Sequence, residues 1–263
     1  MKRVRKSSEP KALEIYRQNI PGAKWESMRN DAEHGGDTAY SACRETAAQD
    51  QGHICAYCEC KIQYRDPLSC RMEHFHDKSD ISSAHNWSLE WTTMLAVCLG
   101  GEREGQKHHL PENLSCDAHK NYMKNAGQYS ESEGWLLNPL QMNTSKSLFD
   151  FDKATGCLIP NEEACGSVTV EGNNYATTQE LVQHTIDILN LNCDRLKEER
   201  RKVLFHLENL KKAQRTAHIP PQQALPSIAR QLFQVRWPAY FTTIRCLLGQ
   251  YAEAYLQSIA YQG

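Results

Sequence analysis

The sequence predicts an α+β fold in which a small cysteine-rich core is embedded in a mostly helical chain. Apolar side chains recur at helical spacing near the N-terminus and over roughly the last hundred residues. Residues 51–125, in contrast, are rich in glycine, cysteine and histidine and contain no long periodic stretch. We therefore expect a helical segment over 1–50, a core over 51–125 and a mainly helical region over 126–263.

The N-terminal segment is expected to contain two helices. Leu13, Tyr16 and Ile20 lie near helical spacing and predict the first, which the following Pro-Gly pair ends. Residues 39–50 predict the second.

Short elements are expected in the core. Cys55 to Cys58 is typical of a knuckle between two short strands. Apolar residues over 86–98 predict a short buried helix or strand, and the polar, glycine-containing residues 99–115 predict a loop. Residues 117–124 fit about one or two turns of helix.

The C-terminal region is expected to begin with strands and to continue in helices. Residues 157–159 and 168–170 predict short strands, and Thr177 and Thr178 are candidate N-caps of a first helix. Apolar spacing and a Pro-Pro break then predict further helices over residues 194–214, 222–233 and 238–260.

Composition and charge limit the functional classes. The chain has no run of about 18 apolar residues, so it cannot span a membrane as a helix. Its basic N-terminus lacks the apolar stretch of a signal peptide, so we expect a cytoplasmic protein. The formal net charge of -2 lacks the basic excess usual for a protein that binds nucleic acid alone. Positive charge is therefore concentrated locally, or a partner helps to hold the substrate.

The cysteines predict a metal site. An odd count of 11 without a secretion signal argues against a disulfide framework. Cys55 and Cys58 have the C-x2-C spacing that lets two thiolates from one turn reach one zinc ion. Cys98 and Cys116 would supply the second pair when the loop between them closes. Cys60 and Cys70 could compete as ligands, and the alternative is that the cysteines are simply buried thiols.

The residues between and after the cysteine pairs predict metal-assisted phosphodiester cleavage. Glu73 lies beside His74, and Asp117, His119 and Lys120 follow the last cysteine of the cluster. A neutral imidazole can deprotonate water near pH 7, and a divalent ion can stabilise charge on a scissile phosphate. Carboxylate ligands favour Mg²⁺ or Mn²⁺, whereas imidazole favours softer metals.

These segments resemble the HNH endonucleases, in which a C-x2-C pair, an acidic residue beside a histidine and a second cysteine pair follow in this order. The chain looks most like the HNH subfamily found with retrons and in the Septu type of anti-phage defence. A Gly-x-Leu-x-Pro element within 149–160 and the stretch 184–192, followed by Leu196 and Arg200, support the resemblance. It covers about residues 50–125 and 148–205 and implies a zinc-supported ββα-metal core.

The resemblance also implies roles for single residues. His74 matches the base that activates water, Glu73 the metal ligand beside it, and Asp117 a second ligand of the catalytic ion. Lys78 and Lys120 match basic residues that contact nucleic acid. The structural zinc cysteines would be Cys55, Cys58, Cys98 and Cys116.

The chain departs from the family pattern in three places. The middle Asn of the motif is replaced by Thr93, while Asn86 is nearby but out of register. The usual Pro-Lys-Ser turn reads Asp-Lys-Ser at residues 77–79, and a long insertion separates the second cysteine pair. In compensation, His119 could replace or assist Asp117 at the metal.

As a whole, the resemblance implies a toxic nuclease effector of an anti-phage system. Its implied partners are an ABC- or SMC-like ATPase and, in the retron version, a reverse transcriptase with its RNA-linked DNA. The target would be DNA or a structured RNA such as tRNA. The rivals are a non-catalytic zinc module that bridges proteins or binds nucleic acid, and a metalloenzyme acting on a small phosphoester.

A basic stretch in the predicted helix 194–214 leaves two interpretations open. Arg195, Arg200 and further lysines and arginines are interleaved with Glu198, Glu199 and Glu208. A solvated face with ion pairs along the helix is one interpretation. A surface that docks phosphate or a partner is the other.

Overall fold

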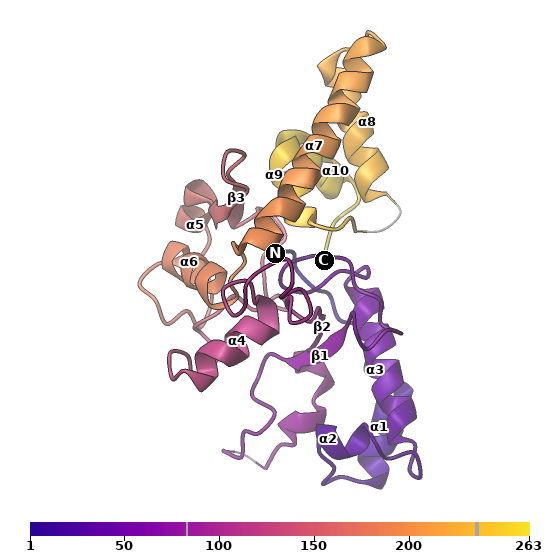
Figure 1. Cartoon of the computed structure of the whole chain (residues 1–263). Coiled ribbons are helices and arrows are strands. Elements are labelled where there is room, and N and C mark those ends of the chain that lie inside the picture. The colour runs from indigo at the N-terminus through magenta and orange to yellow at the C-terminus, as the bar shows by residue number, and fades with distance from the viewer. Residues whose placement is uncertain (83, 235–236) are drawn as a thin grey trace.

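The computed structural model describes residues 1–82, 84–234 and 237–263, and Figure 1 shows their arrangement. Helices dominate, and the strands of the described residues form two separate two-stranded sheets. The predicted mixture of many helices with small strand elements is thereby confirmed. Among the described residues, no helix combines the length and apolar character that a membrane crossing requires.

The N-terminal helices lie at one end of the molecule, below the sheet in Figure 1. Helix α1 (Lys11–Asn19) buries Leu13 and Tyr16 against α3 (Gly36–Asp50), as the apolar spacing predicts. A short helix, α2 (Trp25–Met28), was not predicted and also packs on α3. Because α3 packs in turn on strand β2, these helices form one wall of the core.

The central sheet pairs β1 (Arg71–His74) with β2 (Met94–Val97) in antiparallel register, with Glu73 opposite Leu95 and His74 opposite Met94. Before β2 the chain forms two 3-10 turns, η1 (Trp87–Leu89) and η2 (Trp91–Thr93). The predicted helix or strand over 86–98 is thus both, in succession. Helix α4 (Cys116–Asn125) follows the long loop and continues one residue beyond the predicted helical segment at each end.

The second sheet pairs β3 (Phe149–Phe151) with β4 (Leu158–Pro160), which confirms a strand near 157–159. The strand predicted over 168–170 is wrong. Helix α5 (Glu162–Ser167) precedes it, capped by the Asn161 side chain, which accepts a hydrogen bond from the Ala164 amide. Val168 therefore directly follows the last residue of α5. Its carbonyl accepts a hydrogen bond from the Thr178 hydroxyl and not from a neighbouring strand.

The remaining chain is helical. Thr177, and not Thr178, caps α6 (Thr178–Ile188): its hydroxyl accepts the Glu180 amide while the Glu180 carboxylate accepts the Thr177 amide. The long helix α7 (Asp194–Thr216) matches its predicted range closely. The single helix predicted over 238–260 is wrong, because Gly249 at φ +54° divides it. The last three helices are α8 (Pro221–Phe233), α9 (Phe241–Leu248) and α10 (Gln250–Ser258).

Helix α7 extends away from the sheet, with α8 and α9 packed against it, and both chain ends lie together near its base (Figure 1). Helix α6 contacts both α4 and β4. The C-terminal region thus joins the core through α6 and the start of α7.

Candidate functional site

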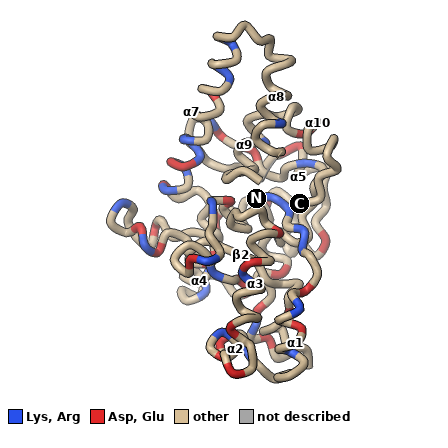
Figure 2. Tube along the Cα trace, turned by 90° about the vertical axis from the view of Figure 1, so that its right-hand side faces the viewer, with Lys and Arg blue, Asp and Glu red and all other residues tan. Residues whose placement is uncertain are grey.

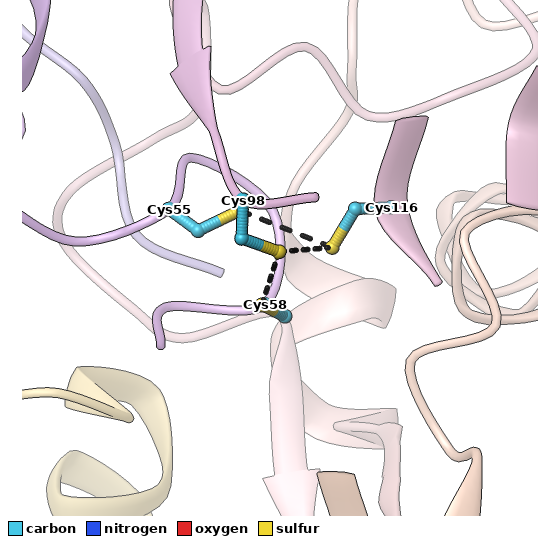
Figure 3. A group of neighbouring side chains, drawn as sticks. All are labelled: Cys55, Cys58, Cys98 and Cys116. Atoms are coloured by element: carbon cyan, nitrogen blue, oxygen red, sulfur yellow. Dashed lines mark hydrogen bonds between the residues drawn. The ribbon is translucent and has the colours of Figure 1, made fainter. Parts of the chain in front are cut away.

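Four buried cysteines meet at one point beside the sheet (Figure 3). The sulfur atoms of Cys55 and Cys116 lie 3.9 Å apart, those of Cys58 and Cys98 3.7 Å, and those of Cys98 and Cys116 3.8 Å. Four sulfurs around a tetrahedral zinc ion at a Zn–S distance of about 2.3 Å would be separated by about 3.8 Å. The group can therefore hold a structural zinc ion, with the four residues that the sequence predicts.

Backbone geometry explains how residues distant in sequence reach this point. The knuckle is closed by the Ile54–Lys61 bridge and by the Cys55 amide, which donates to the Cys60 carbonyl. After Cys98, Gly100 adopts φ +63°, and a Cβ there would lie 2.2 Å from the Ser115 carbonyl oxygen. Only glycine allows this approach, which brings the second pair together.

The long insertion between Cys98 and Cys116 is held by the segment after α6. The Asn190 amide nitrogen donates to the carbonyls of Glu112 and Leu114, both at 2.8 Å. The Cys116 amide donates to the Leu189 carbonyl at 2.7 Å. The downstream stretch 184–192 therefore stabilises the loop that carries the fourth cysteine.

The two competing cysteines lie outside the group of four. Cys70 is buried, and its thiol faces its neighbour's carbonyl, with sulfur 3.8 Å from the Arg71 oxygen. Cys60 is partly buried next to the knuckle and does not belong to the group of four.

A cavity of about 250 Å³ lies between β1 and α4, and it is lined by the residues for which the sequence predicts catalysis. Glu73 and His74 come from β1, and Asp117 and Lys120 come from α4. The exposed side chains of Asp77, Lys78, Asn121 and Lys124 lie at the same cavity. The sheet and the first turn of α4 thus bring the imidazole and both acids to one place.

The His74 ring is fixed by two neighbours. Its Nε2 lies 3.1 Å from the carbonyl oxygen of Ser88, which can only accept a hydrogen bond, so Nε2 carries the proton. The Trp25 ring meets it edge-on at 5.0 Å between centroids. Nδ1 has no hydrogen-bond partner among the residues that the structure describes. Burial lowers the pKa of His74 to about 4, so the ring is neutral near pH 7.

Neither candidate for the middle Asn of the motif contacts this ring. The Asn86 amide donates to the carbonyls of Pro21 and Ala23, at 3.1 and 2.9 Å. The Thr93 hydroxyl donates to the carbonyl of Glu90. Asn86 therefore anchors the segment that carries Ser88 to the segment before α2, and the His74 ring is oriented by a main-chain carbonyl.

Both acids are engaged by basic side chains. Glu73 forms a buried ion pair with Lys120 and accepts the Tyr57 hydroxyl at 3.3 Å. Asp117 is 3.1 Å from the Arg71 guanidinium and accepts the Asn121 amide at 3.0 Å.

Burial and charge shift the ionisation of these groups. Burial raises the pKa of Asp117, against the opposing influence of Arg71, and burial lowers the pKa of Lys120 to about 8. Two carboxylates in a cavity with cations around them are a donor set suited to a hard divalent ion. In the described residues, only the cysteine group brings three or more ligand atoms within 4.8 Å of one another.

One predicted site residue lies outside the cavity, and a second is paired with another side chain. His119 points to α6, where its Nδ1 lies 2.8 Å from the Ile188 carbonyl, and it does not line the cavity. Lys78 lines the cavity but forms an ion pair with Glu26. Sequence reasoning missed Tyr57, Trp25 and Arg71; of these, only Tyr57 had a signal, its place inside the knuckle.

The comparison with known proteins points the same way. The chain is 37% identical over 212 residues to a protein of Escherichia coli that is named as an HNH endonuclease of retron Ec83. The match covers 80% of this chain and 81% of that protein. No family model matches the chain.

Proposed function

The chain belongs to the retron HNH endonuclease family, and we propose that it hydrolyses nucleic-acid phosphodiester bonds at the cavity lined by Glu73, His74 and Asp117. The relationship to the Escherichia coli protein makes it a nuclease of a retron system. The meeting of an imidazole and two acids in one cavity, beside a group of four cysteines, carries the proposal for where the reaction occurs.

The order of β1, β2 and α4 supports a ββα-metal core within this site. Glu73 and His74 stand at the end of the first strand, and Asp117 stands in the first turn of the helix. The four-cysteine group lies beside the Val97 end of β2 and the start of α4 and would keep these elements together with zinc bound.

His74 would act as the general base. Because Nε2–H is directed to the Ser88 carbonyl, Nδ1 is the nitrogen that can accept a proton from water. Glu73 and Asp117 would hold one Mg²⁺ or Mn²⁺ ion. When bound, this ion would offset negative charge on the phosphate and on the leaving 3′-oxygen. Lys120, released from Glu73, would face the phosphate.

A polymeric substrate fits the surroundings better than a small phosphoester. A groove of about 1430 Å³ shares Phe75 and Glu133 with the cavity, and Arg3 and Arg5 line it. Exposed lysines, Lys78 among them, stand at the cavity itself. Elsewhere basic and acidic residues are interspersed along the chain (Figure 2), so local positive charge would guide the strand.

We further propose that the nuclease is the toxic effector of a cytoplasmic anti-phage system of the retron or Septu type. Its net charge of -2 favours a partner that delivers or restrains the substrate. An ABC- or SMC-like ATPase and a reverse transcriptase with its RNA-linked DNA are the proposed partners. DNA and structured RNA such as tRNA are both proposed targets, because the site acts on the backbone.

Cleavage assays with purified protein test the proposal. Wild type, His74→Ala and the control His206→Ala, whose ring is exposed on α7, are incubated with labelled DNA and RNA and Mg²⁺ or Mn²⁺. Loss of the base should slow cleavage by about 10²–10⁴-fold in His74→Ala only. Zinc content and melting temperature show that the variant is folded.

Wild-type rates in His74→Ala would contradict the catalytic assignment. The non-catalytic alternative, a zinc module that binds nucleic acid or bridges proteins, predicts no cleavage by any of the three proteins.

A further inference from the structure

The basic residues of α7 divide into an exposed set and a buried pair. The side chain of Lys202 is 63% exposed, as expected for a solvated face. Arg195 and Arg200, in contrast, are 6% and 1% exposed. Neither interpretation of the basic stretch, a solvated face or a docking surface, applies to these two residues.

The two guanidinium groups lack a full set of partners. In Arg200, Nη1 donates to the Asn192 side chain at 3.3 Å, but Nη2 has no hydrogen-bond partner. In Arg195, Nη2 donates to the Ser115 hydroxyl at 2.7 Å, and Nε has no hydrogen-bond partner, with Glu104 only at 3.8 Å. A buried charge requires an anion nearby, and the Glu104 carboxylate near Arg195 is itself 51% exposed and too distant for a hydrogen bond.

The cysteines of the four-cysteine group, once ionised, are anions beside the start of α7, where the Ser115 hydroxyl lies between Arg195 and the Cys116 sulfur. Burial lowers the pKa of Arg200, and the charge of Cys58 is the largest influence against it. Charges on Cys58, Cys193, Cys98 and Cys116 raise the pKa of Arg195 in spite of its burial. The Ser115 hydroxyl that accepts from Arg195 also contacts the Cys116 sulfur at 3.7 Å, which completes a chain from guanidinium to ligand.

The carboxylate of the knuckle is already engaged. Glu59, between Cys58 and Cys60, accepts the Thr242 amide at 2.8 Å and its hydroxyl at 2.7 Å, and it lies 3.5 Å from the Met1 amine. It therefore cannot serve as a dedicated counter-ion for either arginine.

We propose that Arg195 and Arg200 are the counter-cations of a zinc–tetrathiolate centre at Cys55, Cys58, Cys98 and Cys116. Four thiolates around Zn²⁺ carry a charge of −2, which two guanidinium groups balance. The pair would stabilise the thiolate form that zinc requires, and zinc would in turn hold the start of α7 against the knuckle. The inference rests on the zinc site alone and does not depend on the nuclease reaction.

Zinc release tests this proposal in the full-length, zinc-loaded protein. Arg200→Met and Arg195→Met remove the charge but keep most of the side-chain volume, and Lys202→Met is the matched control on the same helix. Release is followed with a chromophoric zinc chelator. Loss of a partner next to metal ligands should weaken zinc binding by about 10–100-fold in the first two variants and leave the control unchanged.

Two further measurements separate counter-charge from packing. Arg200→Lys, which keeps the charge, should bind zinc more tightly than Arg200→Met. Arg200→Met should also lower the melting temperature more in zinc-loaded than in zinc-stripped protein. Equal losses in both forms, or wild-type zinc affinity in both methionine variants, would overturn the proposal. Wild-type protein that is purified without bound zinc would also overturn the proposal. Cleavage by such a protein would still leave the proposed nuclease function in place. If Arg200→Met does not fold, Arg195→Met and Arg200→Lys decide.

Discussion

At the scale of single residues, His74 differs from a surface histidine because its surroundings define both its tautomer and its charge. The Ser88 carbonyl fixes the proton on Nε2, and Trp25 covers the ring. The sequence predicts this residue as the base through the acid beside it. It could not identify Ser88 or Trp25, because a main-chain carbonyl has no sequence pattern and Trp25 is far away in the chain.

The environment of His74 predicts an unusual pH dependence of cleavage. Since burial lowers the pKa of His74 to about 4, this proposed base stays neutral well below its ordinary pKa of about 6.5. The acid limb of kcat/KM should therefore lie between about pH 4 and 5. In Trp25→Leu, which exposes the ring, the limb should move towards 6.5. A wild-type limb near 6.5 would show that the ring is not buried.

The same shift affects stability. The folded pKa of His74 lies below the unfolded value, so the unfolded chain binds the extra proton. The stabilisation by the neutral ring is complete above about pH 6.5 and is lost as the pH falls from 6.5 towards 4. His74→Asn should therefore make the denaturant midpoint less dependent on pH in this window, and an unchanged slope would contradict the prediction.

Other residues show that spacing in the sequence is not enough to predict which side chains face the cavity or are buried. His119 and Asp117 are close in sequence, but only Asp117 faces the cavity, because helix geometry turns the two side chains to different sides. Asn121, one turn after Asp117, holds the carboxylate in place. Arg195 and Arg200 were expected on a solvated or docking face and are buried, because charge spacing does not reveal an anionic cluster on another segment.

At the scale of elements, local signals predicted most helices well. The apolar spacing of α1 and α7 and the capping box of α6 are properties of neighbouring residues. The strand over 168–170 and the continuous helix over 238–260 failed for tertiary reasons. Val168 follows a capped helix, and Gly249 at φ +54° allows a turn that apolar spacing does not indicate.

The loop between Cys98 and Cys116 depends on one side chain of the segment after α6. Asn190 donates to two loop carbonyls and itself has φ +44°. Asn190→Gly keeps this backbone conformation accessible and removes only the hydrogen bonds. We expect a loss of about 1–3 kcal/mol in the free energy of unfolding and faster zinc release. Denaturant unfolding measures the first effect. An unchanged midpoint would mean that contacts other than the Asn190 hydrogen bonds hold the loop.

At the scale of the whole molecule, the four-cysteine group lies where the N-terminal helices, the sheet and α7 meet. Its ligands come from the knuckle, the end of β2 and the start of α4, and α7 supplies the buried arginines. A cysteine pair separated by a long insertion gives a weak sequence signal. In the structure the loop closes and brings the sulfur atoms of Cys98 and Cys116 to 3.8 Å from each other. The division into segments 1–50, 51–125 and 126–263 stays a prediction.

We expect the proposed ATPase partner to dock on α7 at the exposed side chain of Phe205. Phe205 is 66% exposed on this helix, which extends away from β1 and α4 (Figure 1). Phe205→Glu should reduce co-purification with the proposed ATPase partner while cleavage by the isolated chain stays unchanged. The exposed Ile15 of α1, changed to Glu, is the matched control. Equal co-purification of Phe205→Glu and wild type would place the partner elsewhere.

Chemical rescue tests the role of His74 most directly. His74→Gly leaves a cavity that free imidazole can enter, while Glu73 and Asp117, the proposed ligands of the divalent ion, remain in place. Imidazole should restore part of the cleavage by His74→Gly in the presence of Mg²⁺ or Mn²⁺, and it should restore nothing in Glu73→Ala. Cleavage by His74→Gly at the wild-type rate without imidazole would contradict His74 as the base.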